Sequence, residues 1–596
     1  MFDMMTGYSG PPLRLRRLLI AVPLVVLAVI GIELLELTPH FVLTRELMQT
    51  QDVPVLLLVS ALLLALAFVG APAGSAEQVE RYATSPKAII ATILLAGLVV
   101  ALGTRIVALN TPVSHDEIMA KFDADIIASG RLLAPIAPEW RSFAPALHPA
   151  FRLPVPGDVA WASAYLPGNA AIRAVLGKVF NTELTNAILV MTALLALLGI
   201  ARQLWPQRPD AWAVAVLLGA TSSQVLGMGM TPFAMTAHLT LNLVWLWLFQ
   251  RNTTASHAAA LAVGFLATGL HQIVFHPLFV APFMLQLLIE RRWRLTAFYT
   301  VGYAAIGLFW ILYGQLALKS AGIAPDAAAT AGGTYFIDRV VSLLALFRFL
   351  GFETMVQNLM RFAAWQNPLM LVLLVPGMVL AWKGRWTDNS VVRPLAMGLV
   401  LTIIAMFILL PFQDIGWGYR YIHGLIGSAA LLGAFGWISI TERASLSERR
   451  AAWGVAAVTT AAAVVVLLPL HFRFMYAHIA PYARANLAIE RSGIDAVIIE
   501  VDSIYNGIEL IRNDPDLKKR PLTFQLDQLS EPLVRELCAR MSVRVFDGTD
   551  AAKYGVRRID PTTHAVYPKL VKLRQLAESE ECGKLRRAGG DGRGAK

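Results

Sequence analysis

Long apolar stretches separated by short polar ones make up most of the chain. Runs of roughly 20 apolar residues, the length that crosses a bilayer as an α-helix, recur as far as His471. The pattern predicts about thirteen spans and a fold that is mostly α, a polytopic transmembrane helical bundle. The predicted spans are residues 18–37, 53–73, 88–109, 185–204, 211–230, 233–249, 258–270, 275–289, 295–318, 368–382, 394–410, 421–440 and 452–471.

Positive charges gather in alternate loops between these spans, which is typical of loops that face the cytoplasm. These loops hold Arg81, Lys87, Arg202, Arg208, Arg251, Arg291, Arg292, Arg294, Lys383, Arg385, Arg393, Arg443, Arg449 and Arg450. Residues 1–17 carry three further arginines and are predicted to be cytoplasmic, with the first span an uncleaved signal anchor. The transmembrane regions are then 18–109 and 185–472. The long polar loop at 110–184 and the tail at 473–596 fall on the outer side.

Composition limits the class of protein further. The chain has 596 residues, of which 56% are hydrophobic and 15% charged, so it is too apolar for a water-soluble globular protein. The net charge of +11 would suit a nucleic-acid partner, but the cytoplasmic loops account for it. We therefore expect membrane lipids and no nucleic acid as partners, and a bacterial inner membrane as the location.

The tail at 473–596 differs from the spans. Short apolar runs at 496–501, 522–526 and 543–546 alternate with helix-like segments, and Ser530 followed by Pro532 predicts a helix start. A small soluble α/β domain is the economical interpretation. Both cysteines of the chain, Cys538 and Cys582, fall here. An oxidising outer compartment would pair them as a disulfide; the alternative is two separate thiols, one buried as a small hydrophobic residue.

The sharpest candidate for chemistry is Ser114-His115-Asp116-Glu117, just beyond the third predicted span. A carboxylate near the membrane surface can deprotonate an acceptor hydroxyl or hold a divalent cation. Asp123 lies two turns after Asp116 on the same face of the predicted helix. The alternative is structural, because Ser114 with Glu117 forms a capping box and acidic residues suit the first turn of a helix.

The residues that follow give these acids a context. Gly130-Arg131-Leu132 ends the helix, Tyr165-Leu166-Pro167-Gly168 comes later in the loop, and Ile511-Arg512-Asn513-Asp514-Pro515 with Arg520-Pro521-Leu522 stands in the tail. In this order the motifs resemble the GT-C glycosyltransferases, in particular the aminoarabinose transferases and protein O-mannosyltransferases.

The resemblance implies a polyprenyl-phosphate sugar donor, inversion of the anomeric centre, and Asp116 as the general base or metal-linked carboxylate. It implies Glu117 as a partner of Asp116 or a structural cap, and Tyr165 as a substrate contact. Related sequences often carry a Lys just before the Tyr, where this chain has Ala164. The group that binds the donor phosphate is therefore expected elsewhere.

Arg420 is the first candidate for that group, because the predicted topology puts it and Tyr419 at the outer mouth of a span, where a guanidinium can hold a phosphate. The alternative is an aromatic interfacial anchor. Arg131, Arg141 and Arg173 are further candidates for phosphate binding. His271 and His276 lie between two short spans and are predicted to line a pocket or to satisfy a helix break; two His fall short of a zinc site.

Together these features predict an inverting glycosyltransferase of the GT-C type, which moves a sugar from a polyprenyl-phosphate donor to a glycan, lipid or protein acceptor outside the cytoplasm. The main competing hypothesis is a transporter or flippase, whose signature would be buried polar residues within spans and broken helices. A polysaccharide polymerase or ligase is the next hypothesis, and a non-enzymatic scaffold is the last.

Overall fold

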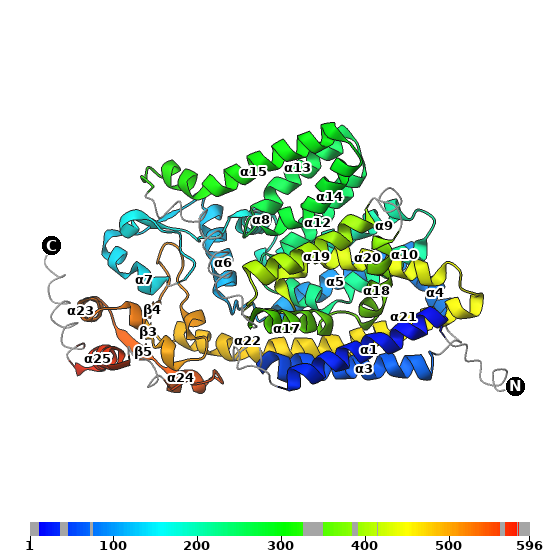
Figure 1. Ribbon diagram of the computed structural model, residues 1–596. Coiled ribbons are helices and arrows are strands. Elements are labelled where there is room, and N and C mark those ends of the chain that lie inside the picture. The colour runs from blue at the N-terminus through cyan, green and yellow to red at the C-terminus, as the bar shows by residue number, and fades with distance from the viewer. Residues whose placement is uncertain are drawn as a thin grey trace. The chain divides into compact units, whose positions relative to one another are not determined.

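A computed structural model describes residues 11–35, 46–71, 76–148, 150–325, 350–383, 391–413, 415–560, 567–580 and 582 (Figure 1). Arg385, most of the predicted cytoplasmic N-terminus and the ends of the first two predicted spans lie outside these ranges. The chain forms two compact units. Unit 1 consists of Met1–Thr104, Glu183–Ile311 and Gly333–Met475, and unit 2 of Arg105–Thr182, Leu312–Gly332 and Tyr476–Lys596.

Apolar helices dominate unit 1. Across the described residues, eight helices are long and apolar enough to cross a membrane, or ten if two sharply bent pairs each count as one span. The prediction of a mainly helical polytopic membrane protein is confirmed. Two shorter apolar helices, Thr254–Thr268 and Phe275–Ile289, coincide with two more predicted spans, and the count of thirteen stays a prediction. The helices are α1 (Leu13–Leu34), α3 (Val53–Phe68), α4 (Ala76–Ala83), α5 (Pro86–Ile106), α9 (Thr185–Leu204), α10 (Pro209–Ala220), α11 (Ser223–Gly229), α12 (Met235–Gln250), α13 (Thr254–Thr268), α14 (Phe275–Ile289), α15 (Trp293–Ser320), α17 (Leu350–Ala364), α18 (Pro368–Trp382), α19 (Val392–Leu409), α20 (Ile426–Thr441), α21 (Leu446–Ala462) and α22 (Leu468–Glu490).

Glycine allows the closest helix contact in unit 1. A Cβ atom added at Gly377 of α18 would lie 2.0 Å from the carbonyl oxygen of Leu432, and one at Gly436 of α20 would lie 2.1 Å from that of Leu373. The two backbones are therefore in direct contact, as small residues permit between membrane helices. Larger residues at these two positions would separate α18 from α20.

Unit 1 also buries an ion pair within its apolar body. The guanidinium of Arg361 lies 3.6 Å from the carboxylate of Asp52, and both side chains are almost fully buried. Trp365 donates its indole N–H to the same carboxylate at 3.2 Å. Charge inside a membrane protein is costly and usually marks a functional or stabilising site.

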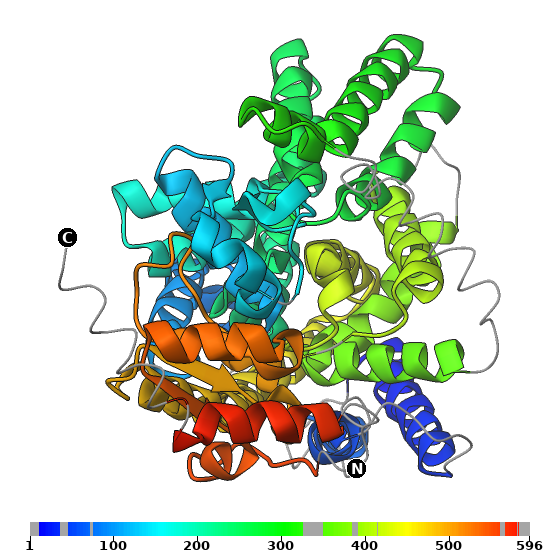
Figure 2. The same ribbon diagram turned by 90° about the vertical axis from the view of Figure 1, so that its left-hand side faces the viewer.

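Unit 2 combines the outer loop with the tail. The tail forms a parallel sheet of three strands in the order β4-β3-β5, with β3 at Ala496–Ile499, β4 at Leu522–Gln525 and β5 at Val543–Phe546. All three match the predicted apolar runs, so the small α/β part near the C-terminus is confirmed. Two helices, α23 (Glu531–Arg540) and α25 (Tyr567–Glu578), pack against each other beside the sheet (Figure 2).

The loop that precedes residue 182 shares a core with this sheet. It contains α6 (His115–Ala128), the short strands β1 (Ala134–Pro135) and β2 (Ala160–Trp161), α7 (Ala144–Leu147) and α8 (Gly168–Val179). Phe143 from the loop and Phe524 from β4 are both fully buried, with ring centroids 5.8 Å apart. The sequence suggests two separate regions here, whereas the structure has one compact unit with one hydrophobic core.

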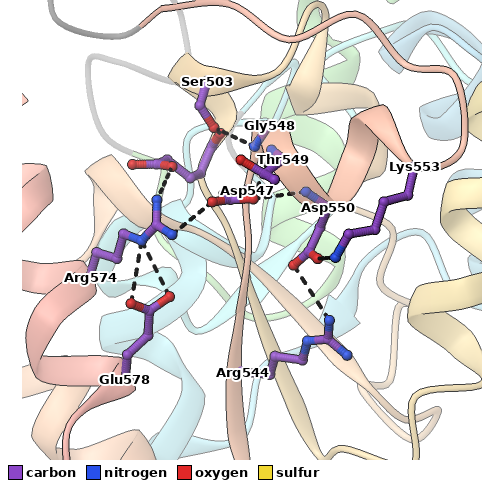
Figure 3. Close-up of polar contacts among 10 residues, drawn as sticks. Ser503, Arg544, Asp547, Gly548, Thr549, Asp550, Lys553, Arg574 and Glu578 are labelled. Carbon is purple, nitrogen blue, oxygen red and sulfur yellow. Dashed lines mark hydrogen bonds and ion pairs between the residues drawn. The ribbon is translucent and has the colours of Figure 1, made fainter.

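Two cross-links hold α25 to the rest of the tail. Cys538 of α23 and Cys582 form a disulfide, with their Cα atoms 4.9 Å apart. Arg574 of α25 donates to Glu500 at 3.2 Å and to Asp547 at 2.7 Å, and these two acids directly follow the carboxyl ends of β3 and β5 (Figure 3). Helix α25 is therefore tied both to α23 and to the carboxyl edge of the sheet.

Candidate active site

Helix α6 begins with a cap made by the predicted residues. Ser114 is the N-cap, and its hydroxyl accepts a hydrogen bond from the backbone N–H of Asp116 at 3.3 Å. The carboxylate of Glu117 accepts from the backbone N–H of Val113 at 2.9 Å. These are the two reciprocal bonds of a capping box, each shifted by one residue. Capping therefore accounts for Ser114 and Glu117 and leaves Asp116 without such a role.

Asp116 joins two separate motifs of the outer loop. It is partly exposed at the first turn of α6, and the hydroxyl of Tyr165 donates a hydrogen bond to its Oδ1. Tyr165 is itself fixed, because its backbone N–H donates to Ser163 Oγ at 2.9 Å and its ring packs beside Phe151 with centroids 5.0 Å apart. The Tyr-x-Pro-Gly motif thus positions the carboxylate of the Asp-Glu motif.

Glu117 is a different kind of carboxyl group from its neighbour. Its side chain is fully buried, and Oε1 has no hydrogen-bond partner among the described residues. Burial raises the pKa of Glu117 to about 8, and the carboxylates of Glu509 and Asp116 add to the rise. Glu117 is therefore mostly protonated at pH 7 and is out of reach of a substrate.

Asp123 shares the face of Asp116, as its spacing predicts, and is also buried. Its Oδ1 accepts from the backbone N–H of Ser163 at 2.9 Å, and burial raises its pKa to about 7. Asp123 thereby fixes the segment that carries Tyr165. Of the three acids at 116, 117 and 123, only Asp116 keeps an exposed part.

The tail motif packs against the same loop. Arg512 donates to the carbonyl of Pro112 at 2.5 Å, just before α6. Asn513 donates to the carbonyl of Leu147 at 2.9 Å, and the indole of Trp161 donates to the carbonyl of Pro515 at 2.9 Å. The segments that carry the sequence resemblance are therefore brought together in unit 2.

The arginines predicted as phosphate ligands in the loop have structural partners. Arg131 forms a 2.8 Å ion pair with Asp516, and Arg141 donates to the carbonyl of Ile136 at 3.2 Å. Arg173 of α8 is buried and has Glu117 as a charged neighbour. Arg131 and Arg141 hold the loop to itself or to the tail.

Arg420 and Tyr419 belong to unit 1. Arg420 is almost fully buried, and its guanidinium lies over the rings of Phe233 and Tyr421, 5.4 and 5.2 Å from their centroids. Tyr419 is fully buried, and its hydroxyl points to the sulfur of Met355 at 3.6 Å. Arg420 is thus held between aromatic rings, an arrangement that suits a guanidinium.

The two predicted histidines also lie in unit 1, in different surroundings. His276 is fully buried in α14, with Nδ1 2.8 Å from Asn242 and Nε2 2.9 Å from the hydroxyl of Tyr303. His271 is partly exposed in the link between α13 and α14. Both ring nitrogens of His276 are used in packing, so its side chain has a structural role.

A metal centre at Asp116 is a further hypothesis from the sequence. Within the described ranges, no group of three or more His, Cys, Asp or Glu side chains is placed to hold a metal ion. A divalent metal ion at Asp116 stays a prediction from the sequence.

Comparison with solved structures finds similar chains, whereas no family model and no curated protein matches the chain. The structure is similar to that of ArnT from Cupriavidus metallidurans bound to undecaprenyl phosphate, with 12% sequence identity, a TM-score of 0.45, and coverage of 72% of this chain and 86% of that chain. The apo state of ArnT gives 14% identity, a TM-score of 0.41, and coverage of 72% and 84%.

Sequence reasoning missed one polar pair in unit 2. His115 Nδ1 lies 3.0 Å from the carboxylate of Glu509, and both side chains are buried. Nothing in the local sequence relates two residues 394 positions apart. The only signal was that Glu509 lies just before the Ile511–Pro515 motif.

Proposed function

We propose that this protein is an inverting glycosyltransferase that moves a sugar from a polyprenyl-phosphate donor to a hydroxyl group of a glycan, lipid or protein acceptor outside the cytoplasm. The observation that carries the proposal is the hydrogen bond between Tyr165 and Asp116. It joins, at one partly exposed carboxylate, the two loop motifs on which the resemblance to GT-C enzymes rests.

The chemistry asked of Asp116 is general base catalysis. The acceptor hydroxyl oxygen attacks the anomeric carbon of the donor, and its proton passes to the carboxylate of Asp116. The bond between the anomeric carbon and the phosphate oxygen breaks, and its electron pair leaves with the polyprenyl phosphate. Attack from the face opposite the leaving group inverts the anomeric centre.

Burial decides which acid takes this role. A base must reach the proton that it removes. Glu117 and Asp123 are buried and hold backbone N–H groups, with pKa values raised to about 8 and about 7 by burial. Asp116 is partly exposed and is oriented by Tyr165. We therefore assign Asp116 as the base and Glu117 as a cap.

Arg420 is proposed to meet the phosphate of the donor. A guanidinium pairs with phosphate through directed hydrogen bonds, and the rings of Phe233 and Tyr421 fix the guanidinium of Arg420. The alternation of charged loops along the sequence supports an outward-facing site in a bacterial inner membrane. The sugar donor would then be lipid-linked rather than nucleotide-linked.

A transfer assay with full-length protein tests the proposal. Purified protein in liposomes is given a radiolabelled polyprenyl-phosphate sugar and an extract of cell-envelope acceptors. Wild type should move label into the acceptor, and Asp116→Asn should lose at least about 100-fold in rate, in line with the loss of a general base. Glu139→Gln, which removes an exposed acid of the same loop, is the matched control. Near-normal turnover by a folded Asp116→Asn protein would overturn the assignment.

A transporter or flippase remains the second candidate, because unit 1 contains the features expected of one. The ion pair of Arg361 with Asp52 is buried in its apolar body. Helices α10 and α11 meet at a 52° bend, and the pair 352–364 and 368–382 meets at 117°. Movement of a labelled lipid-linked sugar across liposomes without an acceptor would favour this function over transfer.

A further inference from the structure

A cavity in unit 2 lies on the far side of α6 from Asp116. Its volume is about 610 Å³, and it is lined by three segments, at 109–125, 483–490 and 512–519. Ile118, Lys121, Phe122 and Asp125 of α6 line it at helical spacing, so they share one face of the helix. Asp116 is on the opposite face. The size suits a ligand of one or two sugar units.

Four cationic side chains line this cavity, Lys121, Arg484, Arg512 and Lys519, and none forms an ion pair within the described part of the chain. Arg484 donates to the backbone carbonyl of Tyr554 at 3.0 Å. Lys121 and Lys519 have no carboxylate within 4 Å of their amines among the described residues. The guanidinium of Arg512 donates only to backbone carbonyls, those of Pro112 at 2.5 Å and Glu509 at 2.9 Å. Cations placed together without partners repel one another and favour an anion. Burial lowers the pKa of Lys121, and the charge of Arg512 lowers it further, while Asp125 and Glu117 act in the opposite direction.

Most of the acids that line the cavity are already engaged. The carboxylate of Asp514 accepts three backbone N–H groups, from Asp516, Lys518 and Lys519. Glu490 accepts from the side chain of Asn486 at 2.8 Å. Asp125 faces Lys121 and Lys519 as a charge, and Glu490 acts on Arg512. Three acids, Asp125, Glu490 and Asp514, thus stand against four cations in the lining, which leaves the cation cluster incompletely balanced.

The remaining lining is what a carbohydrate needs. Side-chain amides of Asn110 and Asn486 supply hydrogen bonds, and Phe122, Ile118 and Leu487 supply apolar surface. A ligand that is only an anion would not use this apolar wall. A ligand that is only a neutral sugar would leave the lysines unpaired.

We propose that this cavity binds a sugar unit that carries a phosphate or carboxylate group. Assigning that sugar to the acceptor rests on the proposed function. An α-helix with its side chains is about 10–12 Å across. The anionic group and the hydroxyl that reacts at Asp116 therefore belong to different sugar units of one acceptor.

Binding is measured by calorimetry on the full-length protein in detergent, with glucose 6-phosphate as the probe. Glucose is the neutral match and inorganic phosphate the free anion. Glucose 6-phosphate should bind more tightly than either. Lys121→Ala and Lys519→Ala should each weaken its binding about tenfold or more, the usual effect of losing a charge-assisted contact. Lys518→Ala, which removes an exposed neighbouring lysine outside the cavity, should change nothing.

Three results would overturn the proposal: no binding of glucose 6-phosphate to wild type, equal binding of phosphate alone, or equal losses in the Lys518→Ala control. No donor is present in this experiment, so its result is independent of catalysis. A protein that binds the probe in the cavity and transfers no sugar would contradict the proposed function and keep the site. A protein that transfers sugar and does not bind the probe would keep the proposed function and contradict the site.

Discussion

Tyr165 donates its hydroxyl hydrogen to Asp116, although the two residues are 49 positions apart in the chain. The bond orients the carboxylate toward the position of an acceptor hydroxyl that the proposed function requires. Tyr165→Phe should therefore slow transfer by roughly tenfold, less than Asp116→Asn, because the base remains but is held less well.

Steady-state rates, divided by the amount of folded enzyme, would check this prediction. A purely structural role for Tyr165 would lower the amount of folded enzyme and leave the rate per folded molecule unchanged. Phe151→Leu provides the control, since it disturbs the ring that packs on Tyr165 and keeps the hydroxyl.

The raised pKa of Glu117 predicts that the stability of the folded protein depends on pH. This pKa is about 8 in the folded protein against an ordinary value of 4.5, chiefly through burial. Between these two values the folded protein holds a proton that the unfolded chain has released, so stability falls as pH rises through this window. Glu117→Gln imitates the protonated acid and keeps an acceptor for Val113, and should remove this fall.

Thermal unfolding of wild type and Glu117→Gln at pH 5 and pH 8 would measure the effect. The melting temperature of the variant, relative to that of wild type, should be higher at pH 8 than at pH 5, where the two should differ little. Parallel behaviour of the two proteins at both values would show that Glu117 is not protonated in the folded state. Transfer by this variant should be affected less than by Asp116→Asn.

The spans and strands were predictable because each follows from a local pattern. Length and hydropathy indicate helices such as α9 and α19. Short apolar runs between helix-like segments indicate β3, β4 and β5 to within a residue or two. The bends were not predictable in this way. An apolar run at 211–230 looks like one span, but Ser222 caps a second helix within it, and the two helices meet at 52°.

The site was predictable only in part, because burial is not a local property. The sequence leaves open whether Glu117 is a partner of Asp116 or a structural cap, and the structure shows that Glu117 is fully buried whereas Asp116 is partly exposed. The sequence also suggests His276 as a pocket residue, whereas Asn242 and Tyr303 occupy both its nitrogens. Partners that far apart in sequence cannot be read from spacing.

The next prediction is that Arg420 binds the phosphate of the donor. A charge-assisted contact is worth roughly 1.5 to 3 kcal/mol, or about ten- to a hundredfold in affinity. Arg420→Ala should weaken donor binding by at least that much, and Arg420→Lys should recover part of it because it keeps the charge and loses the planar fork.

Equilibrium binding of labelled donor, with thermal unfolding measured in parallel, separates affinity from stability. This is necessary because Arg420 is buried between Phe233 and Tyr421. Arg473→Ala, the loss of an exposed arginine of unit 1, is the control for charge alone. Unchanged donor affinity in both Arg420 variants would move the phosphate site elsewhere.

The cross-links of α25 give the last prediction. The disulfide between Cys538 and Cys582 closes a loop of 44 residues, which stabilises the folded tail by about 4 kcal/mol in the chain-entropy model. Replacing both cysteines by Ser should leave α25 attached through the buried Leu570 and Leu573, and through Arg574, which bonds Glu500 and Asp547 (Figure 3). Hydrogen exchange should therefore speed up in α25 and stay unchanged in β3, and adding Arg574→Ala should speed it up further. Thiol labelling of the denatured, unreduced wild type checks the premise, because two reactive thiols would refute the bond and weaken the assignment of the tail to an oxidising compartment.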